Sequence, residues 1–385
     1  MPNFGPPRVM FVRGSGTRLW DREGNEYLDF LGGLAVVALG HAHPEVADAI
    51  ARQASTLLHV SSIFATEHAW HVARTIDRLI AGGSGTADGQ VFFCNSGAEA
   101  NEAAIKLARK WAGHGRFGVV TTYGSFHGRT LATLAATGQP AKHEPFAPMP
   151  EGFRHVALND VDALEAAIDE TTAAILLEPI QGEGGVNPAS ADFLLAARRL
   201  ADERGLLLML DEVQTGLGRT GRWFGFQHHD VRPDVVCLAK ALGNGMPIGA
   251  LWARADVAAA FRPGDHGSTY SGQPLATAAA RSVLEIMERD GLAERADRMG
   301  ALLRRSLEAL RAVRSVRGAG LILAAELGEG VDAKAVADAC LDAGLVVNAI
   351  TATALRLTPP LTVSEAELAE GVRILDAVLS ATAVA

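Results

Sequence analysis

The chain has 385 residues, of which 48% are hydrophobic and 21% charged, and its formal net charge at pH 7 is −9. This length and composition predict a globular protein with a large core and two or more packed units. The acidic balance argues against a nucleic-acid or anionic-membrane surface, which needs a basic patch, so small molecules are the expected partners.

The start of the chain and its cysteines bear on the compartment. The first residues carry neither the basic nor the apolar segment of a signal peptide, and no stretch approaches the length of a membrane span. Cys94, Cys237 and Cys340 are odd in number and far apart, which fits a reducing environment rather than a disulfide framework. We therefore expect a cytoplasmic protein.

In chain order, the first predicted element is a hairpin, with strands at 18–21 and 26–30 joined by the turn 22–25. Short apolar runs then alternate with longer amphipathic stretches. The expected strands are 91–93, 117–120, 173–177, 206–210 and 235–239, and the expected helices are 99–111, 128–136 and 191–204. This alternation predicts an α/β unit with a mostly parallel sheet over roughly residues 85–275.

Beyond the sheet, helices are expected at 276–287 and 293–313, followed by a strand, a helix and a strand at 320–326, 333–343 and 355–358. These patterns divide the chain into three parts. Residues 1–55 form an N-terminal segment that contributes to a small domain, residues 56–290 a large domain, and residues 291–385 a C-terminal small α+β domain.

Ligands bind at the carboxyl ends of the strands in doubly wound folds, so polar residues that follow the apolar runs are candidates for a site. After the run at 91–93, Asn95 or Ser96 can cap a helix, and Gly97 and Ala98 leave free amides at its positive end. Such an end suits a phosphate group. The alternative is an ordinary capped helix whose first-turn acids complement the dipole.

Acidic residues follow two other runs. Asp211 ends the run at 206–210, where a buried carboxylate needs a cation or a hydrogen-bond donor. A protonated pyridine nitrogen would satisfy it, as would a structural salt bridge or a helix cap. Glu178 and Glu183 lie in the turn after 173–177, and one of them could be a simple turn acid.

The strand end after 117–120 leads to Phe126 and Arg129. An aromatic face beside a guanidinium suits a flat cofactor ring and a carboxylate, because rings stack and arginine binds carboxylates with two hydrogen bonds. A packed phenylalanine and a surface arginine form the alternative interpretation.

Lys240 follows the run at 235–239 and precedes a glycine-rich stretch at 241–249. A lysine at the end of a buried strand, without a counter-charge nearby in sequence, is partly desolvated, which lowers its pKa and makes its amine nucleophilic. On position alone, an ordinary lysine leaving a strand for solvent is the better explanation. The residues at the other strand ends, among them Gly97, Phe126 and Asp211, instead favour the interpretation of Lys240 as a Schiff-base lysine.

Two further patterns do not indicate sites. Residues 216–221, Gly-Leu-Gly-Arg-Thr-Gly, match the dinucleotide fingerprint, but they do not follow the strand directly and no amphipathic helix comes after them, so we discount a nicotinamide site. The histidines at 41, 43, 228 and 229 lack acidic or cysteine ligands at metal-binding spacing, so we expect no metal.

With these residues in place, the chain closely resembles the class III, subgroup II pyridoxal-phosphate-dependent aminotransferases. The similarity runs essentially from end to end. The shared motifs stand at 19–21, 27–31, 39–41, 95–102, 126–129, 178–185, 211–221, 240–249, 266–269 and 356–361. The resemblance implies an α/β enzyme of fold type I, in which the large domain binds pyridoxal 5'-phosphate beside a smaller α+β domain.

The resemblance also implies how the cofactor is held. Lys240 would form the Schiff base and then shuttle the proton in catalysis, and Asp211 would keep the pyridine nitrogen protonated. Phe126 and Val213 would enclose the ring, and Gln214 would approach its phenolic oxygen.

The phosphate of the cofactor would be bound at the helix end by Ser96, Gly97 and Ala98. Thr269 of the partner subunit would complete this site. The resemblance therefore implies a homodimer with shared active sites.

Two arginines are implied to bind substrates. Arg129 would bind the α-carboxylate of an ornithine-type donor, and Arg356, masked by Glu183 when the other substrate is bound, that of glutamate or 2-oxoglutarate. Ser268 is a further implied substrate contact. The implied ping-pong reaction moves the δ-amino group of N2-acetylornithine to 2-oxoglutarate, giving N-acetylglutamate 5-semialdehyde and glutamate, a step in arginine biosynthesis.

The choice of donor depends on a few side chains. Leu34 and Phe4 stand where ornithine-specific members of the family carry tyrosines, and their apolar side chains favour an acylated amine. Ornithine, succinylornithine and N-succinyl-diaminopimelate stay open as donors. The departures from the family pattern are Val37, Ser62, Ser271 and Gln273. Ser62 and Ser271 are expected near the substrate mouth or the dimer seam, so they bear on acyl specificity more than on catalysis.

Two other classes of function fit less well. An aminomutase on the same fold would need no 2-oxoglutarate, and the presence of Arg356 with Glu183 argues against it. A cofactor-binding regulator would need a basic helix-turn-helix, which neither end of this acidic chain offers.

Overall fold

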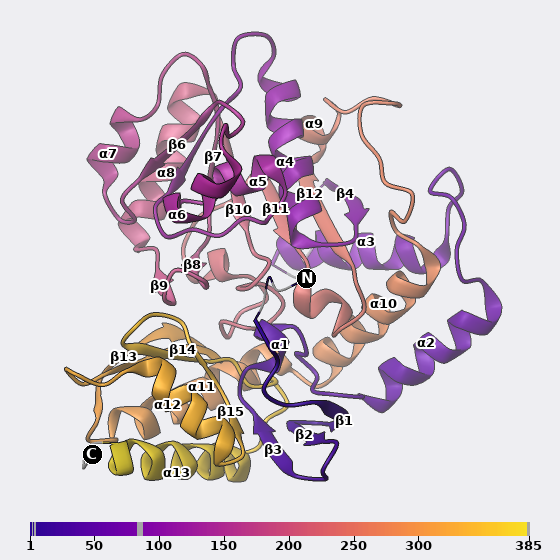
Figure 1. Ribbon diagram of the computed structural model, residues 1–385. Helices are drawn as coiled ribbons and strands as arrows, with labels where there is room; N and C mark the ends of the chain where they lie inside the picture. The colour runs from indigo at the N-terminus through magenta and orange to yellow at the C-terminus, as the bar shows by residue number, and fades with distance from the viewer. Residues whose placement is uncertain (2, 4, 83–87, 383–385) are drawn as a thin grey trace.

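The computed structural model describes residues 1–385 except 2, 4, 83–87 and 383–385. Its centre is a seven-stranded sheet with the order β4-β12-β11-β10-β7-β5-β6 (Figure 1). The strands are β4 Gly89–Cys94, β5 Gly118–Thr122, β6 Phe153–Val156, β7 Thr172–Leu177, β10 Leu207–Asp211, β11 Val235–Leu238 and β12 Gly249–Arg254. Those from β11 to β6 are parallel, and β12 is antiparallel to both of its neighbours. The predicted α/β class with a mostly parallel sheet is confirmed.

The central strands are apolar throughout because helices cover both faces of the sheet. α4 (Gly97–Ala112) packs on one face, in a buried cluster with Leu207 and Met209. α3 (Glu67–Ile80) and α8 (Ala191–Arg204) contribute to the cluster on the other face, with Leu208 and Leu210. Successive side chains of a strand point to opposite faces, so β10 serves both clusters.

Some elements of this part differ from the prediction. The strands β6 and β12 have no counterpart among the predicted elements, and α5 begins at Leu131 rather than at 128, because Gly128 has a φ of 143°, outside the helical region. The other elements here are α1 Gly32–Ala35, α2 Pro44–Thr56, α5 Leu131–Ala136, α6 Pro140–His143, α7 Val161–Ala166, β8 Ile180–Gln181, β9 Asn187–Pro188, α9 Ala255–Ala258 and α10 Pro274–Arg289.

The N-terminal strands lie beside the C-terminal part of the chain (Figure 1). β1 (Phe11–Ser15), β2 (Arg18–Asp21) and β3 (Glu26–Asp29) form an antiparallel meander, which confirms the predicted hairpin. β3 also pairs in parallel with β15 (Leu345–Val346). The division of the chain into three parts stays a prediction. The pairing of β3 with β15 brings the N-terminal segment against the C-terminal part of the chain.

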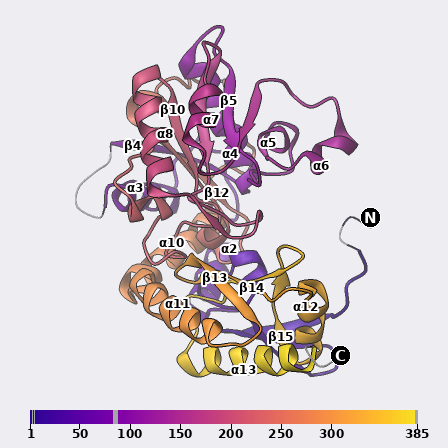
Figure 2. The same cartoon turned by 90° about the vertical axis from the view of Figure 1, so that its left-hand side faces the viewer.

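A second sheet, β13-β14-β17-β16, forms the C-terminal part together with three helices (Figure 2). The elements are α11 Leu292–Glu308, β13 Val313–Ala319, β14 Ile322–Leu327, α12 Ala333–Asp342, β16 Asn348–Ala349, β17 Ala354–Leu357 and α13 Glu365–Thr382. The helix predicted at 293–313 ends at Glu308, because Val313 already begins β13.

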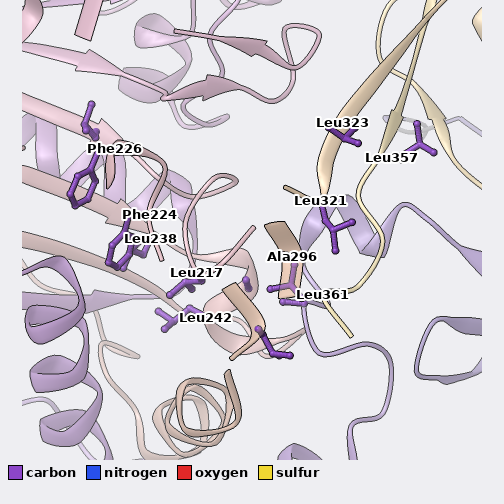
Figure 3. Close-up of a cluster of buried hydrophobic side chains, with 14 of the residues drawn as sticks. Leu217, Phe224, Phe226, Leu238, Leu242, Ala296, Leu321, Leu323, Leu357 and Leu361 are labelled. Atoms are coloured by element: carbon purple, nitrogen blue, oxygen red, sulfur yellow. The ribbon is translucent and has the colours of Figure 1, made fainter. Parts of the chain in front are cut away.

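A continuous buried cluster joins the two parts (Figure 3). Leu217, Leu238 and Leu242 come from the sheet side, and Leu321 and Leu361 come from the C-terminal side. The two parts therefore share one apolar core. Of the helices in the described part of the chain, none is both long and apolar enough to cross a bilayer.

Candidate active site

A cavity of about 370 Å³ lies where the polar strand ends meet, a size typical of small-molecule sites. Residues far apart in the sequence line it together. The predicted residues among them are Ser96, Gly97, Ala98, Phe126, Arg129, Glu178, Glu183, Asp211, Val213, Gln214 and Lys240.

Lys240 lies two residues after the end of β11 and begins the short 3₁₀ turn Lys240–Gly243. Its backbone is left-handed, with a φ of 42°, which is uncommon for a residue with a side chain. Burial lowers the pKa of its amine to about 8, and the charge of Arg356 acts in the same direction against that of Glu183. Lys240 lines the cavity, so a nucleophilic amine is available to a ligand bound there.

Asp211 ends β10 and is 4% exposed. Its Oδ2 accepts a hydrogen bond from Asn101 Nδ2 at 2.7 Å and lies 2.9 Å from His127 Nδ1, while its Oδ1 accepts one from the amide of Val213 at 3.0 Å. Sequence reasoning assigned no role to Asn101 or His127. The available signal was that a buried carboxylate requires donors.

The start of α4 forms one wall of the cavity. Ser96 caps the helix, and its hydroxyl accepts a hydrogen bond from the amide of Glu99 at 3.2 Å. The amides of Gly97 and Ala98 open the helix, where no intrahelical acceptor exists. A Cβ added to Gly97 would lie 2.9 Å from both methyl groups of Val213, so the glycine allows the helix end to approach the opposite wall closely.

Glu178 supports the loop that carries Phe126. Its carboxylate accepts hydrogen bonds from the amides of Phe126 at 2.9 Å and Gly182 at 3.3 Å. Burial, together with the charge of Asp211, raises the pKa of Glu178 well above its ordinary value. Arg129 lies over the Phe126 ring, with 5.4 Å from the guanidinium carbon to the ring centroid, and its side chain stays exposed.

Arg356 lies behind the cavity wall and is fully buried. Its Nη1 donates to Glu183 Oε1 at 2.6 Å, to Gln214 Oε1 at 3.2 Å and to the carbonyl of Gly182 at 3.2 Å. Although burial opposes it, the charge of Arg356 lowers the pKa of Glu183. Nη2 has no hydrogen-bond partner among the described residues, so the guanidinium retains donors for another carboxylate.

Several predicted residues do not line this cavity. Ser268 contacts its edge, because its hydroxyl accepts a hydrogen bond from Asn95 at 3.1 Å, whereas Thr269 is exposed. Leu34 is 42% exposed, and Phe4 lies outside the described residues.

The departures from the family pattern also lie outside the cavity lining. Ser62 is exposed and Val37 is half-buried. Ser271 is buried and donates its hydroxyl to the carbonyl of Phe93, and Gln273 precedes α10 without a side-chain cap bond. The buried hydroxyl of Ser271 therefore serves packing within this subunit.

The groups at the cavity fit pyridoxal phosphate. The start of α4 suits a phosphate, the buried Asp211 suits a protonated ring nitrogen, and Lys240 supplies an amine that condenses with an aldehyde. Within the described residues, no group of three or more His, Cys, Asp or Glu side chains could hold a metal ion.

Comparison with known sequences decides the family. The profile described as Aminotransferase class-III matches residues 2–379. This chain belongs to that family.

The aminotransferase is 48% identical over 388 aligned residues to the acetylornithine aminotransferase of Caldanaerobacter subterraneus subsp. tengcongensis, with 99% of this chain and 97% of the relative covered. The ornithine aminotransferase of Toxoplasma gondii, solved with partial occupancy of PLP at its active site, has a TM-score of 0.92 and 35% identity, with 99% and 92% covered. The N-acetylornithine aminotransferase of Stenotrophomonas maltophilia has a TM-score of 0.85 and 37% identity, with 100% and 98% covered.

These likenesses and the family membership identify the chain as an enzyme. It is a transaminase that uses pyridoxal phosphate and acts on small molecules.

Proposed function

We propose that this aminotransferase moves the δ-amino group of N2-acetylornithine to 2-oxoglutarate, forming N-acetylglutamate 5-semialdehyde and glutamate, and so works in arginine biosynthesis. One observation carries the proposal: Arg129 is open at the cavity, whereas Arg356 is closed behind Glu183. Two substrates whose carboxylates lie at different distances from the reacting amine need two such cations. Relatives that are 48% and 49% identical to this chain are named acetylornithine aminotransferases, which supports acetylornithine as the donor.

In this proposal Arg129 binds the α-carboxylate of acetylornithine and directs its distal amine toward Lys240. The charge of Glu183 neutralises Arg356 at this stage, since the two are 2.6 Å apart. When glutamate or 2-oxoglutarate enters, Glu183 leaves and Arg356 binds the α-carboxylate. The unpaired Nη2 of Arg356 supports this exchange, because a bidentate carboxylate uses two donors.

Bound pyridoxal phosphate supplies an electron sink for the carbanion that forms when a proton leaves the substrate. Lys240 accepts that proton at Nζ and returns it, for which a pKa of about 8 is suitable. Asp211 holds the ring nitrogen protonated, and Asn101 and His127 hold Asp211. Phe126 and Val213 enclose the ring.

Three other groups complete cofactor binding in the proposal. Gln214 approaches the phenolic oxygen of the cofactor, and its place on the cavity wall supports this role. Ser96, Gly97 and Ala98 bind the phosphate at the start of α4. Ser268 contacts the substrate from the edge of the cavity, where its hydroxyl accepts a hydrogen bond from Asn95.

We propose a homodimer in which the partner subunit's Thr269 completes the phosphate site. Thr269 is exposed and does not line the cavity of its own chain, which supports this arrangement. Ile63, Phe64 and Tyr270 are 85%, 65% and 59% exposed, and apolar residues exposed in this way are typical of an interface. The cytoplasm is the proposed location, supported by the free thiols of the chain.

The test is a donor panel with 2-oxoglutarate as acceptor. We expect kcat/KM for acetylornithine to exceed those for ornithine, succinylornithine and N-succinyl-diaminopimelate by about 10- to 200-fold, the range that a few pocket contacts give. Arg129→Ala should lower kcat/KM for acetylornithine about 10- to 100-fold, because charged hydrogen bonds of roughly 1.5–3 kcal/mol are lost. A preference for ornithine, or unchanged acetylornithine turnover in Arg129→Ala, would contradict the proposal.

A further inference from the structure

Arg219 lies in the glycine-rich segment 216–221 and is 1% exposed. Its Nη1 donates hydrogen bonds to the carbonyls of Leu321 at 3.0 Å and Pro359 at 2.5 Å. The amide of Leu321 in turn donates to the Arg219 carbonyl at 2.9 Å. The segment that resembles a dinucleotide fingerprint therefore joins the sheet part of the chain to the C-terminal part.

This connection is costly. Nε and Nη2 of Arg219 have no hydrogen-bond partner among the described residues, and within the same residues no carboxylate forms an ion pair with it. Burial lowers the pKa of Arg219 to about 9. Burying a cation without a counter-charge costs free energy, and well-packed apolar residues often replace even buried ion pairs without loss of stability. Packing by itself therefore does not account for an arginine at this position.

The two carbonyls lie just outside β17, the strand that carries Arg356, and β14, its neighbour. Leu321 directly precedes β14, and Pro359 follows the end of β17 by two residues. Arg356 lies in β17 opposite Ala324 of β14. The guanidinium of Arg219 thus ties the same ends of both strands to one point.

At its other end, the connection is anchored to the active-site loop. Residues 211–215, which include Asp211 and Gln214, lead directly into 216–221. Gln214 Oε1 accepts a hydrogen bond from Arg356 Nη1 at 3.2 Å. The approach is tight, because a Cβ added to Gly320 would lie 2.6 Å from the Arg219 carbonyl. Arg219 therefore lies in a continuous connection between the loop that carries Gln214 and the strand that carries Arg356.

We propose that Arg219 is a positioning residue that sets Arg356 at the distance from the cavity required to bind the α-carboxylate of glutamate or 2-oxoglutarate. The inference rests on the proposed function, in which Arg356 serves this substrate and not the amine donor. Loss of Arg219 therefore affects one half-reaction. A misplacement of about 1 Å can cost roughly 10²-fold in rate.

The test measures the two half-reactions separately, by stopped-flow absorbance of the holoenzyme with acetylornithine alone and with glutamate alone. In Arg219→Met we expect the second-order rate constant of the glutamate half-reaction to fall about 10- to 100-fold, with that of the acetylornithine half-reaction within about twofold of wild type. Arg219→Lys keeps a donor for the two carbonyls, so its glutamate half-reaction should be faster than that of Arg219→Met. If Arg219→Met does not fold, Arg219→Lys replaces it and should still show a slower glutamate half-reaction than the wild-type enzyme.

Arg295→Met is the matched control. Arg295 also donates to backbone carbonyls, those of Leu361, Thr362 and Val363, but these acceptors lie four to six residues beyond the end of β17. Its loss should lower the melting temperature without separating the half-reactions. A selective glutamate defect in Arg295→Met as large as that in Arg219→Met would overturn the positioning role.

Arg356→Gln separates the inference from the proposed function. If it impairs the glutamate half-reaction selectively but Arg219→Met and Arg219→Lys slow both half-reactions equally, or neither, the positioning role of Arg219 is wrong while the proposed function stands. If Arg356→Gln itself slows both half-reactions equally, the carboxylate assignment in the proposed function is wrong, and the inference about Arg219 is wrong with it.

Discussion

Lys240 combines a left-handed backbone with a buried amine. Each feature costs free energy, the first through steric strain and the second through desolvation of the charged form. Sequence position indicates the second feature, because the lysine follows a buried strand. The first depends on how the chain turns from β11 into Lys240–Gly243, which the sequence pattern did not indicate.

The lowered pKa of Lys240 predicts the pH dependence of its reaction with an aldehyde. In the cofactor-free enzyme, the rate of Schiff-base formation with pyridoxal should rise with pH, because only the neutral amine reacts. The midpoint of the rise should lie at about pH 8, the pKa of Lys240, with a plateau above it. Absorbance followed across the pH range checks this. A midpoint near 10.5, the ordinary lysine value, would contradict it.

Glu183→Gln provides the control for this experiment. The charge of Glu183 raises the pKa of Lys240, while that of Arg356 lowers it. Removing the carboxylate should therefore move the midpoint below that of the wild-type enzyme. A midpoint that rises would show that the neighbouring charges do not act on Lys240 in this way.

At the scale of elements, the sequence predicts α4 as a helix and places both of its ends within two residues. The expected helix at 99–111 corresponds to Gly97–Ala112, and Ser96 caps it as one of the two candidates. The cap, the glycine and the apolar spacing are local signals. The closeness of Gly97 to Val213 is not local, since it depends on the distance between α4 and the end of β10.

Gly97→Ala should weaken cofactor binding. The new methyl group would lie 2.9 Å from the Val213 methyl groups, and overpacking of this kind typically costs about 1–3 kcal/mol. We expect the dissociation constant of pyridoxal phosphate, measured by fluorescence titration, to rise about tenfold or more, since 1.4 kcal/mol corresponds to tenfold.

The matched control is Gly328→Ala, where the nearest atom to the new Cβ is the carbonyl oxygen of Ala312 at 3.6 Å. This substitution should leave cofactor affinity unchanged. If Gly97→Ala also bound the cofactor as tightly as the wild-type enzyme, the close approach of α4 to Val213 would not matter for the site.

At the scale of the whole molecule, the proposed dimer predicts complementation between two defective variants. Lys240→Ala lacks the reactive amine. Thr269→Ala lacks the hydroxyl that completes the phosphate site of the partner subunit. In a mixed dimer, one site combines Lys240 of one subunit with Thr269 of the other. After equal amounts of the two variants are mixed and re-equilibrated at low cofactor concentration, about a quarter of all sites should be intact, because half of the dimers are hybrid and each hybrid carries one intact site.

Activity at limiting pyridoxal phosphate checks this prediction, with each variant incubated alone as the control. Recovery above the sum of the two controls is the expected result. If Thr269 instead served the site of its own chain, no hybrid site would be intact and mixing would restore nothing.

The sequence by itself determined which residues stand at the ends of the central strands. Apolar runs, caps and glycines are local patterns, so Ser96, Phe126, Asp211 and Lys240 could be placed at strand ends that share one edge of the sheet. The family motifs added the roles of these residues. The antiparallel β12 escaped prediction, because its sequence Gly-Ala-Leu-Trp-Ala-Arg contains no β-branched residue and shows no alternation.

Only the tertiary structure decided how remote segments meet. Asn101 and His127 surround Asp211 from positions 110 and 84 residues away, and Arg356 meets Glu183 across 173 residues. Arg219, part of a pattern discounted from its sequence, became the link between the two parts of the chain. Such contacts depend on strand order, register and the docking of the C-terminal sheet, and no local pattern specifies the distances between those elements.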